Sequence, residues 1–368
     1  MGKHDEAIRD YFFGGAGREV SLSQNRTDWD RISLIPRVLH DVSEVDIETE
    51  LVGKRVPTPV VVAPMAFLSL IRPRGEAILA EAAALNQLSF CLSSRSSMAL
   101  ESVAEVYLNA LVRIGYESGC RPLLMFQIYV MRDQNISASL FKRAIKSGVD
   151  AIVVTVDAPY IGLRPRDRTN NLSIPDEMLV ANVREELLLE STVVEMPTFG
   201  RGVSSAKHAR LAQDPSMTWA KLEELCSLAD STPILLKGIL DPADAALASS
   251  LRFGGVIVSN HGGRQLDGAI STPTALHQLQ ISNQEPFGTV VVDGSIETGS
   301  DIVKARALGA DGVMMGRIFA KALLDGGPNR LHTSMSRLID DLHTSTALMG
   351  FPRWRDIDPS RILVPKKY

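Results

Sequence analysis

The residues with the clearest capacity for chemistry lie in one short run, SNHGGRQ, at positions 259–265. His261 can accept a proton near neutral pH, and Arg264 can bind a carboxylate through two parallel hydrogen bonds. The two glycines between them let the backbone approach a bound molecule closely. The run therefore predicts a base beside a cation that binds a carboxylate.

Other polar residues and two glycines end or follow short apolar runs, as residues at the ends of buried strands do. The polar residues are Gln127, Tyr129, Thr155, Asp157, Lys237, Asp293 and Arg317, and the glycines are Gly294 and Gly316. Asp157 could orient the imidazole of His261 and stabilise its cation. Lys237 ends an apolar run, where a lysine with only a structural role is uncommon. We therefore expect these residues to share one site with the 259–265 run.

Eight short apolar runs alternate with segments of helical periodicity. The predicted strands are Val60–Ala63, Ser89–Leu92, Leu123–Ile128, Ala151–Val156, Ile234–Lys237, Val256–Ser259, Thr289–Asp293 and Gly312–Met315. The clearest predicted helices are Glu76–Leu85, Ile136–Lys146, Trp219–Leu228, Pro242–Ser250, Pro273–Leu279 and Asp301–Leu308. Continuous apolar runs are typical of parallel strands buried on both faces. We predict an α/β fold, a (β/α)8 TIM barrel, in which the strand ends converge on one mouth.

The barrel is expected to form a single domain over residues 1–368, with two additions. An N-terminal extension covers residues 1–56, ahead of the first strand of the barrel. A long insertion covers residues 158–232, after the fourth strand. The insertion therefore belongs to the mouth, where the active sites of such barrels lie.

The composition limits the classes of partner. Hydrophobic residues make up 45% and charged residues 22% of the chain, as in ordinary globular proteins. The net charge of −4 gives no indication of nucleic-acid or membrane binding. The 3 cysteines are scattered without metal-type spacing, and no signal peptide or membrane span is recognisable. We expect a cytoplasmic protein without a metal site, nucleic-acid partner or membrane partner.

The run SNHGGRQLDG at 259–268 resembles the active-site signature of the FMN-dependent 2-hydroxy acid oxidases and dehydrogenases, the group of glycolate oxidase, lactate oxidase and mandelate dehydrogenase. The resemblance covers nearly the whole chain. It includes DYFFGGAG, VVAPMA, LSSRSS, FQIYV, TVDAPYIGLR, LLKGI, DGSI and GVMMGR. It implies a flavoprotein that oxidises an L-2-hydroxy acid to a 2-keto acid with FMN as cofactor. It also implies a homo-oligomer, since the family is commonly tetrameric.

The resemblance further implies roles at the reacting end of the substrate. His261 would be the base and Asp157 its partner. Arg264 and Arg164 would hold the substrate carboxylate with help from Tyr11. The sequence leaves open whether the base takes the α-proton or the hydroxyl proton of the substrate. It also leaves open whether oxygen, a quinone or another protein accepts the electrons.

The resemblance implies the remaining contacts as well. Tyr129 would hydrogen-bond the substrate hydroxyl. Lys237 would lie beside the N1–C2 carbonyl edge of the flavin, where its charge stabilises the reduced ring. The other implied cofactor contacts are the backbone of Ala66, then Ser93, Gln127 and Thr155 at the isoalloxazine, Asp293 at the ribityl chain, Gly316 and Arg317 at the phosphate, and Ser259 and Gly294.

Two positions depart from the family pattern. The family usually reads Asp-Gly-Gly-Val-Arg after the seventh strand, and that arginine binds the phosphate, but Glu297 stands here instead. We expect Glu297 to turn to solvent, Arg317 to carry the phosphate, and FMN binding to be weaker than usual. Arg95 stands where the family lines the substrate pocket, near a helix expected to start at about Ser97. It indicates either a substrate with a second acidic group or an ordinary pair with a local carboxylate.

Two other functions stay open. An FMN barrel enzyme of different chemistry would not need the pair of His261 and Arg264. A catalytically silent barrel with impaired FMN binding is compatible with Glu297. The intact set of chemical residues favours neither alternative.

Overall fold

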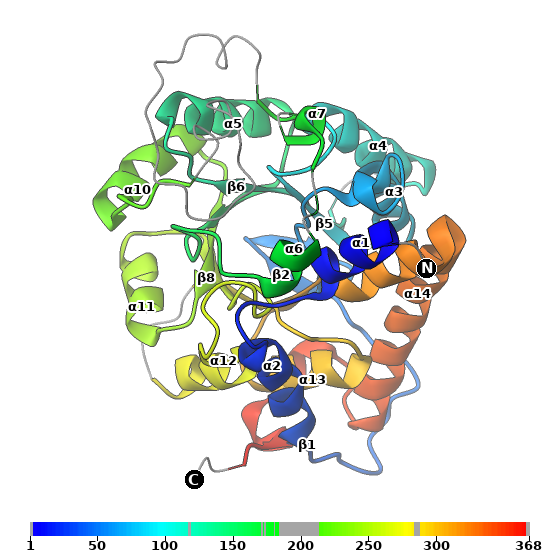
Figure 1. The fold of residues 1–368 in the computed structure, drawn as a ribbon. Helices are drawn as coiled ribbons and strands as arrows, with labels where there is room; N and C mark the ends of the chain where they lie inside the picture. The colour runs from blue at the N-terminus through cyan, green and yellow to red at the C-terminus, as the bar shows by residue number, and fades with distance from the viewer. Residues whose placement is uncertain are drawn as a thin grey trace.

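The computed structural model describes residues 3–116, 119–170, 172, 174–179, 181–183, 213–282 and 288–365. Its centre is a closed barrel with the strand order β10-β11-β4-β5-β6-β7-β8-β9. Helices surround the barrel, and Figure 1 shows this ring with the barrel at its middle. The predicted (β/α)8 architecture, with its N-terminal extension and its insertion after the fourth barrel strand, is confirmed.

The eight barrel strands lie within two residues of their predicted bounds. They are β4 (Val60–Val62), β5 (Ser89–Ser93), β6 (Leu124–Tyr129), β7 (Ala151–Thr155), β8 (Ile234–Ile239), β9 (Gly255–Val258), β10 (Thr289–Val292) and β11 (Gly312–Met315). Neighbouring strands pair in parallel around the whole barrel. Alternate residues, such as Val61, Met125 and Val153, fill the barrel interior. Apolar side chains on the other face of the strands pack against the helices.

The predicted helices are also present, and further helices join them. The helices that follow barrel strands are α3 (Gly75–Leu85), α4 (Leu100–Arg113), α5 (Gln134–Lys146), α10 (Trp219–Cys226), α11 (Pro242–Ser250), α12 (Thr272–Ile281), α13 (Gly299–Ala307) and α14 (Arg317–Leu348). The expected helix start at about Ser97 was wrong, because α4 begins at Leu100. The backbone N–H of Leu100 donates to the side chain of Asn182 (2.9 Å), a distant residue that the local sequence does not reveal.

The N-terminal extension contributes to both ends of the barrel. It contains α1 (Lys3–Phe13), α2 (Val20–Arg31), β1 (Ser33–Leu34), β2 (Thr49–Leu51) and β3 (Lys54–Val56). The β2–β3 hairpin buries Leu51 and Val56 against the barrel interior. At the mouth, α1 lies beside α6 (Pro165–Asn170), which follows β7, and Figure 1 shows the two near the middle of the barrel. β1 pairs with β12 (Ile362–Leu363) near the C-terminus.

The insertion after β7 is partly described. It contains α6, α7 (Asp176–Leu179) and α10, and α10 is followed by a 3-10 turn at Ser227–Ala229. Residues 184–212 of the insertion lie outside the described residues. Among the helices of the described ranges, none is long and apolar enough to cross a membrane.

Candidate active site

Three side chains from different strands meet at the mouth of the barrel. Asp157 follows β7, His261 follows β9, and Tyr129 ends β6. Nδ1 of His261 lies 3.0 Å from Oδ1 of Asp157, and Nε2 lies 3.1 Å from Oη of Tyr129. We call these three residues the base corner. An imidazole between a carboxylate and a phenol is the arrangement expected of an oriented general base.

The surroundings of the base corner favour a neutral imidazole on His261 and an ionised carboxylate on Asp157, the protonation states that a general base and its partner need. Burial lowers the pKa of His261, and the carboxylate of Asp157 opposes that shift, while Lys237 and Arg164 add to it. Burial also acts to raise the pKa of Asp157, but His261 and Lys237 outweigh it, so the pKa of Asp157 is lowered. At neutral pH the imidazole is therefore neutral and Asp157 is ionised. Asp157 then accepts from Nδ1, which leaves the lone pair on Nε2 beside Tyr129.

The backbone that carries the base is a left-handed turn. His261, Gly262 and Gly263 have φ values of 59°, 62° and 74°. A histidine in this region costs about 1 kcal/mol, and such strain is typical of functional sites. A Cβ atom on Gly262 would lie 2.9 Å from the Arg317 guanidinium, and one on Gly263 would lie 2.5 Å from the backbone N of Leu22. In this structure the two glycines therefore allow other segments of the chain to approach closely.

A second buried group joins three neighbouring strand ends. Nζ of Lys237 lies 2.9 Å from Oδ2 of Asp293 and donates to Oγ of Ser259 (2.8 Å). Ser259 donates to the same Oδ2 (2.8 Å). Burial acts to lower the pKa of Lys237, but Asp293 and Asp157 outweigh it and hold that pKa above its ordinary value. Lys237 is therefore a permanent buried cation within electrostatic range of the base corner.

Three polar side chains form a buried ladder across β5, β6 and β7. Ser93 donates to Oε1 of Gln127 (2.9 Å), and Nε2 of Gln127 donates to Oγ1 of Thr155 (2.9 Å). Ala66 lies in the loop after β4, and the next residue, Phe67, donates its N–H to the carbonyl of Arg95 (3.1 Å). The predicted isoalloxazine contacts are thus on adjacent strands at one level of the mouth.

Arginines gather beside the base corner. Arg264 donates through Nη1 to the carbonyls of Tyr11 (2.6 Å) and Gly14 (2.9 Å), and its guanidinium lies 5.3 Å from the centre of the Tyr11 ring. Nε of Arg164 lies 3.4 Å from the carbonyl of Arg264. Burial, followed by the charge of Arg164, lowers the pKa of Arg264 to about 9. Half-buried cations that repel one another stabilise a bound anion, so this cluster suits a carboxylate.

Arg95 lies close to the same group of residues. Its guanidinium is within electrostatic range of the phenols of Tyr129 and Tyr11, and Nη2 lies 3.8 Å from Sδ of Met131. Burial lowers the pKa of Arg95, and the two phenols oppose that shift. The structure therefore brings Arg95 to the base corner.

The predicted phosphate contacts, Gly316 and Arg317, follow β11, and the predicted ribityl contact, Asp293, follows the neighbouring strand β10. We call residues 293–298 and Arg317 the phosphate end. Glu297 is exposed, as predicted, while Arg317 donates to the carbonyls of Phe12 (3.3 Å) and Gly14 (3.2 Å). Burial lowers the pKa of Arg317 to about 10, and acids including Asp293 and Glu297 oppose that shift.

These residues fit a phosphorylated flavin. Oδ1 of Asp293 is buried and has no hydrogen-bond partner, which suits a hydroxyl of a ribityl chain. Gly316 precedes the N-terminus of α14, where Arg317 supplies a cation and the helix amides attract an anion. Within the described ranges, no group of three or more His, Cys, Asp or Glu side chains is placed to hold a metal ion.

Sequence reasoning missed the residues that brace the mouth. Asn25 and Asn260 exchange two buried side-chain hydrogen bonds (2.9 and 2.8 Å), which join α2 to the loop of His261. Buried Glu76 accepts from the N–H groups of Leu68 (3.0 Å) and Ser97 (2.7 Å), which joins the loops after β4 and β5. The apolar run Ala77–Ala80 that follows Glu76 was the available signal, because a carboxylate on a buried helix face needs donors.

Comparisons with known proteins agree with this geometry. Residues 2–364 match the model of the FMN-dependent dehydrogenase family. An L-lactate oxidase of Nostoc sp. is 38% identical over 95% of this chain and 92% of its own length. A 4-hydroxymandelate oxidase of Amycolatopsis orientalis is 36% identical over 93% of this chain and 90% of its own length. A solved mandelate oxidase variant with an FMN adduct is 31% identical, covers 98% of both chains and has a TM-score of 0.79.

The family match extends over nearly the entire chain, and the relatives are well above 30% identical over most of their length. The buried groups at the mouth suit the parts of a flavin nucleotide. The chain therefore belongs to the FMN-dependent dehydrogenase family, and its cofactor is FMN.

Proposed function

We propose that this protein oxidises an L-2-hydroxy acid to the corresponding 2-keto acid. The observation that carries the proposal is the base corner, where Asp157 orients His261 beside Tyr129. The arginine cluster of Arg264 and Arg164 lies next to it. The names of relatives such as L-lactate oxidase and 4-hydroxymandelate oxidase support the same substrate class.

Each residue has a definite part in the proposed reaction. Arg264 and Arg164 bind the substrate carboxylate and so direct the hydroxyl-bearing carbon towards the base corner. His261 accepts a proton at Nε2, and Asp157 stabilises the resulting imidazolium at Nδ1. Tyr129 hydrogen-bonds the oxygen that becomes the carbonyl. FMN, when bound, would supply the acceptor for the two electrons and the second hydrogen that the substrate loses.

The cofactor contacts follow the same pattern. Lys237 places its charge at the flavin ring, near Ser93, Gln127, Thr155 and the backbone of Ala66. The other proposed contacts, at the ribityl chain and the phosphate, are Ser259, Asp293, Gly294, Gly316 and Arg317. Tyr11 completes the carboxylate site, which its contact with the Arg264 guanidinium supports.

We also propose that the substrate carries a second acidic group, such as a carboxylate or a phosphonate. The position of the half-buried Arg95 cation near Tyr129 and Tyr11 supports this. In the wild type, dicarboxylic or phosphonic 2-hydroxy acids should then have a higher kcat/KM than lactate or mandelate. Arg95→Met should reverse that preference. Faster turnover of the simple acids by the wild type would contradict a second acidic group.

The proposed reaction is tested by its product. The FMN-saturated protein is incubated with an artificial electron acceptor and either enantiomer of several 2-hydroxy acids, and keto acid is measured as its hydrazone. Keto acid from L enantiomers alone is expected. Bound FMN without keto acid from any substrate would favour an FMN enzyme of other chemistry, and a protein that binds no FMN would favour the silent barrel.

Two further properties belong to the proposal. We propose that the protein is cytoplasmic and forms a homotetramer. The resemblance of the whole chain to a commonly tetrameric family supports the tetramer. We propose oxygen or a soluble carrier as electron acceptor, supported by the oxidase names of several relatives. Light scattering of the purified protein and oxygen consumption during turnover test the assembly and the acceptor.

A further inference from the structure

Two loops carry the residues of the proposed base pair and of the proposed carboxylate-binding pair. The loop after β7 bears Asp157 and Arg164, and the loop after β9 bears His261 and Arg264. The position of one loop relative to the other therefore sets the orientation of the base and the spacing of the carboxylate-binding arginines.

These loops are not on neighbouring strands, because β8 lies between β7 and β9. Two strand spacings are roughly 10 Å, more than a side-chain hydrogen bond can span. The loops approach each other over Gly238 of β8, which has φ 109° and sits at an irregularity in the pairing of β8 with β9. A Cβ atom on Gly238 would lie 2.4 Å from Cβ of Asp157. The missing side chain of Gly238 thus gives Asp157 room to reach across.

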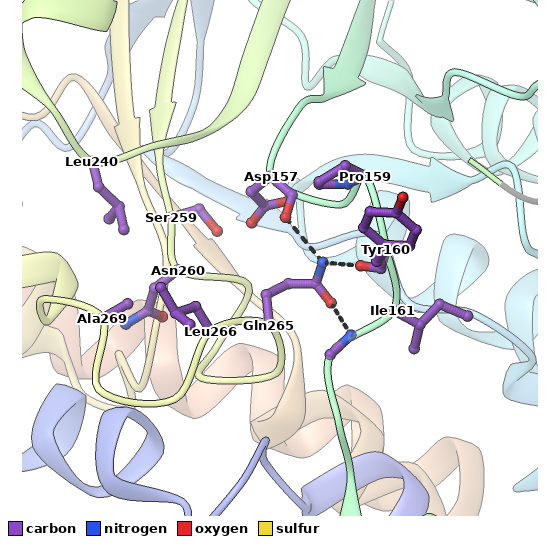
Figure 2. A pocket seen from close by; sticks show the side chains of 11 residues that line it. Asp157, Pro159, Tyr160, Ile161, Leu240, Ser259, Asn260, Gln265, Leu266 and Ala269 are labelled. Carbon is purple, nitrogen blue, oxygen red and sulfur yellow. Dashed lines mark hydrogen bonds between the residues drawn. The ribbon is translucent and has the colours of Figure 1, made fainter. Parts of the chain in front are cut away.

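Gln265 bridges the two loops with one side-chain amide. Its Nε2 donates to the carbonyls of Asp157 (2.9 Å) and Tyr160 (2.9 Å), and its Oε1 accepts from the N–H of Gly162 (3.0 Å) (Figure 2). Both donor positions and the acceptor of the amide are therefore directed at a single loop. Gly162 fits against this bridge only as glycine, because a Cβ atom there would lie 2.3 Å from the carbonyl oxygen of Arg264.

Gln265 lies beside the reacting groups and does not lie among them. It lines a pocket of about 310 Å³ together with Asp157, Leu240 and Ser259, and Figure 2 shows Gln265 between the two loops. The lining of that pocket includes neither His261 nor Arg264. The three hydrogen bonds of the Gln265 side chain all go to backbone groups of the loop after β7, so we expect it to act through the loop that it holds.

We propose that Gln265 is a positioning residue that fixes the loop of Asp157 and Arg164 against the loop of His261 and Arg264. This inference rests on the proposed function. Methionine has a similar shape and makes none of the three hydrogen bonds. Glutamate keeps the acceptor but loses both donors and places a carboxylate against two carbonyl oxygens. Either change should let Asp157 move away from His261.

The test uses the FMN-saturated holoenzyme and its anaerobic reduction by the best L-2-hydroxy acid. Gln265→Met and Gln265→Glu should each lower the reduction rate roughly 10- to 100-fold, since small misplacements cost about that much. In the uncharged Gln265→Met variant, the acid limb of the pH profile should move to lower pH, because Asp157 opposes the lowering of the His261 pKa. FMN affinity should stay within about twofold. Gln134→Met is the matched control, because Gln134 also bridges two segments of the mouth, donating to the carbonyl of Met131 (3.2 Å) and to Oδ2 of Asp214 (3.3 Å), yet these hydrogen bonds reach neither Asp157 nor the loop of His261.

A double-mutant cycle tests whether the effect of Gln265 on the reduction rate is transmitted through Asp157. In an Asp157→Asn background, Gln265→Met should cost much less than it does alone, because Asp157 can no longer orient the base. Full additivity, an unshifted pH profile, or equal losses in Gln134→Met would each overturn the inference. A wild type that no hydroxy acid reduces overturns the proposed function, whereas a reducible wild type with unimpaired Gln265 variants overturns this inference alone.

Discussion

In the base corner, His261 lies between a carboxylate and a phenol, and the buried cation of Lys237 lies nearby. Next to the phosphate end, the guanidinium of Arg26 forms an ion pair with Asp301 (2.7 Å) and donates to the carbonyl of Ser295 (2.8 Å). The exposed Glu297 adds a negative charge to the proposed phosphate site, where Arg317 supplies a positive one. The proposed base is therefore pre-organised by its hydrogen bonds, whereas the proposed phosphate site offers only Arg317 and helix amides against the charge of Glu297. Catalysis and cofactor retention should then respond to different substitutions.

The largest expected effect comes from the base itself. His261→Gln should lower the rate of flavin reduction by roughly 10²- to 10⁴-fold, the usual value of a general base. FMN affinity should change little. Stopped-flow absorbance under anaerobic conditions measures the rate, with His343→Gln on α14 as the control. A near-wild-type rate in the His261 variant would remove the base corner from the reaction.

Loss of the partner carboxylate should have the next largest effect. Asp157→Asn removes the charge that opposes the lowering of the His261 pKa, so that pKa should fall further. Because the base acts in its neutral form, activity in the variant should persist to lower pH than in the wild type. The rate at neutral pH should drop about 10- to 100-fold, because the imidazole is less firmly oriented. A pH profile that is displaced upwards would contradict this pairing.

A smaller change is expected at the carboxylate site. Arg264→Lys keeps a positive charge but removes the planar pair of donors. KM should rise about tenfold, while the rate at saturating substrate changes less. Steady-state kinetics with a simple monocarboxylic hydroxy acid measures both values. A loss confined to the maximal rate would show that Arg264 does not bind the substrate in the ground state.

The smallest effects should appear at the phosphate end, and they should concern binding alone. Glu297→Gln should strengthen FMN binding by a few fold, and Glu297→Arg by roughly tenfold, because each reduces repulsion of the phosphate. Riboflavin affinity should not change. Fluorescence titration of the apoprotein measures both, with Glu44→Gln in the N-terminal extension as the control. Equal effects on FMN and riboflavin would indicate that Glu297 does not act on the phosphate.

The two regions also differ in how far the sequence predicted them. The barrel strands were recognisable because parallel strands are buried on both faces, and the side chains at their ends then converge by the geometry of the fold. The start of α4 was misplaced because its N–H partner, Asn182, comes from a distant segment. The sequence could not predict the bridge formed by Gln265, since its hydrogen bonds go to backbone groups, which have no sequence signature. The sequence showed that position 297 carries a negative charge. It did not show that Arg26 pairs with Asp301, because those two residues are far apart along the chain.

The central claim is tested most directly by anaerobic reduction of the FMN-saturated protein, without any electron acceptor. The protein is mixed with L and D enantiomers of mono- and dicarboxylic 2-hydroxy acids, and the visible flavin absorbance is followed. We predict rapid bleaching by at least one L enantiomer, no bleaching by its D counterpart, and severe slowing in His261→Gln. A protein that holds FMN yet is bleached by none of these acids would contradict the proposed reaction.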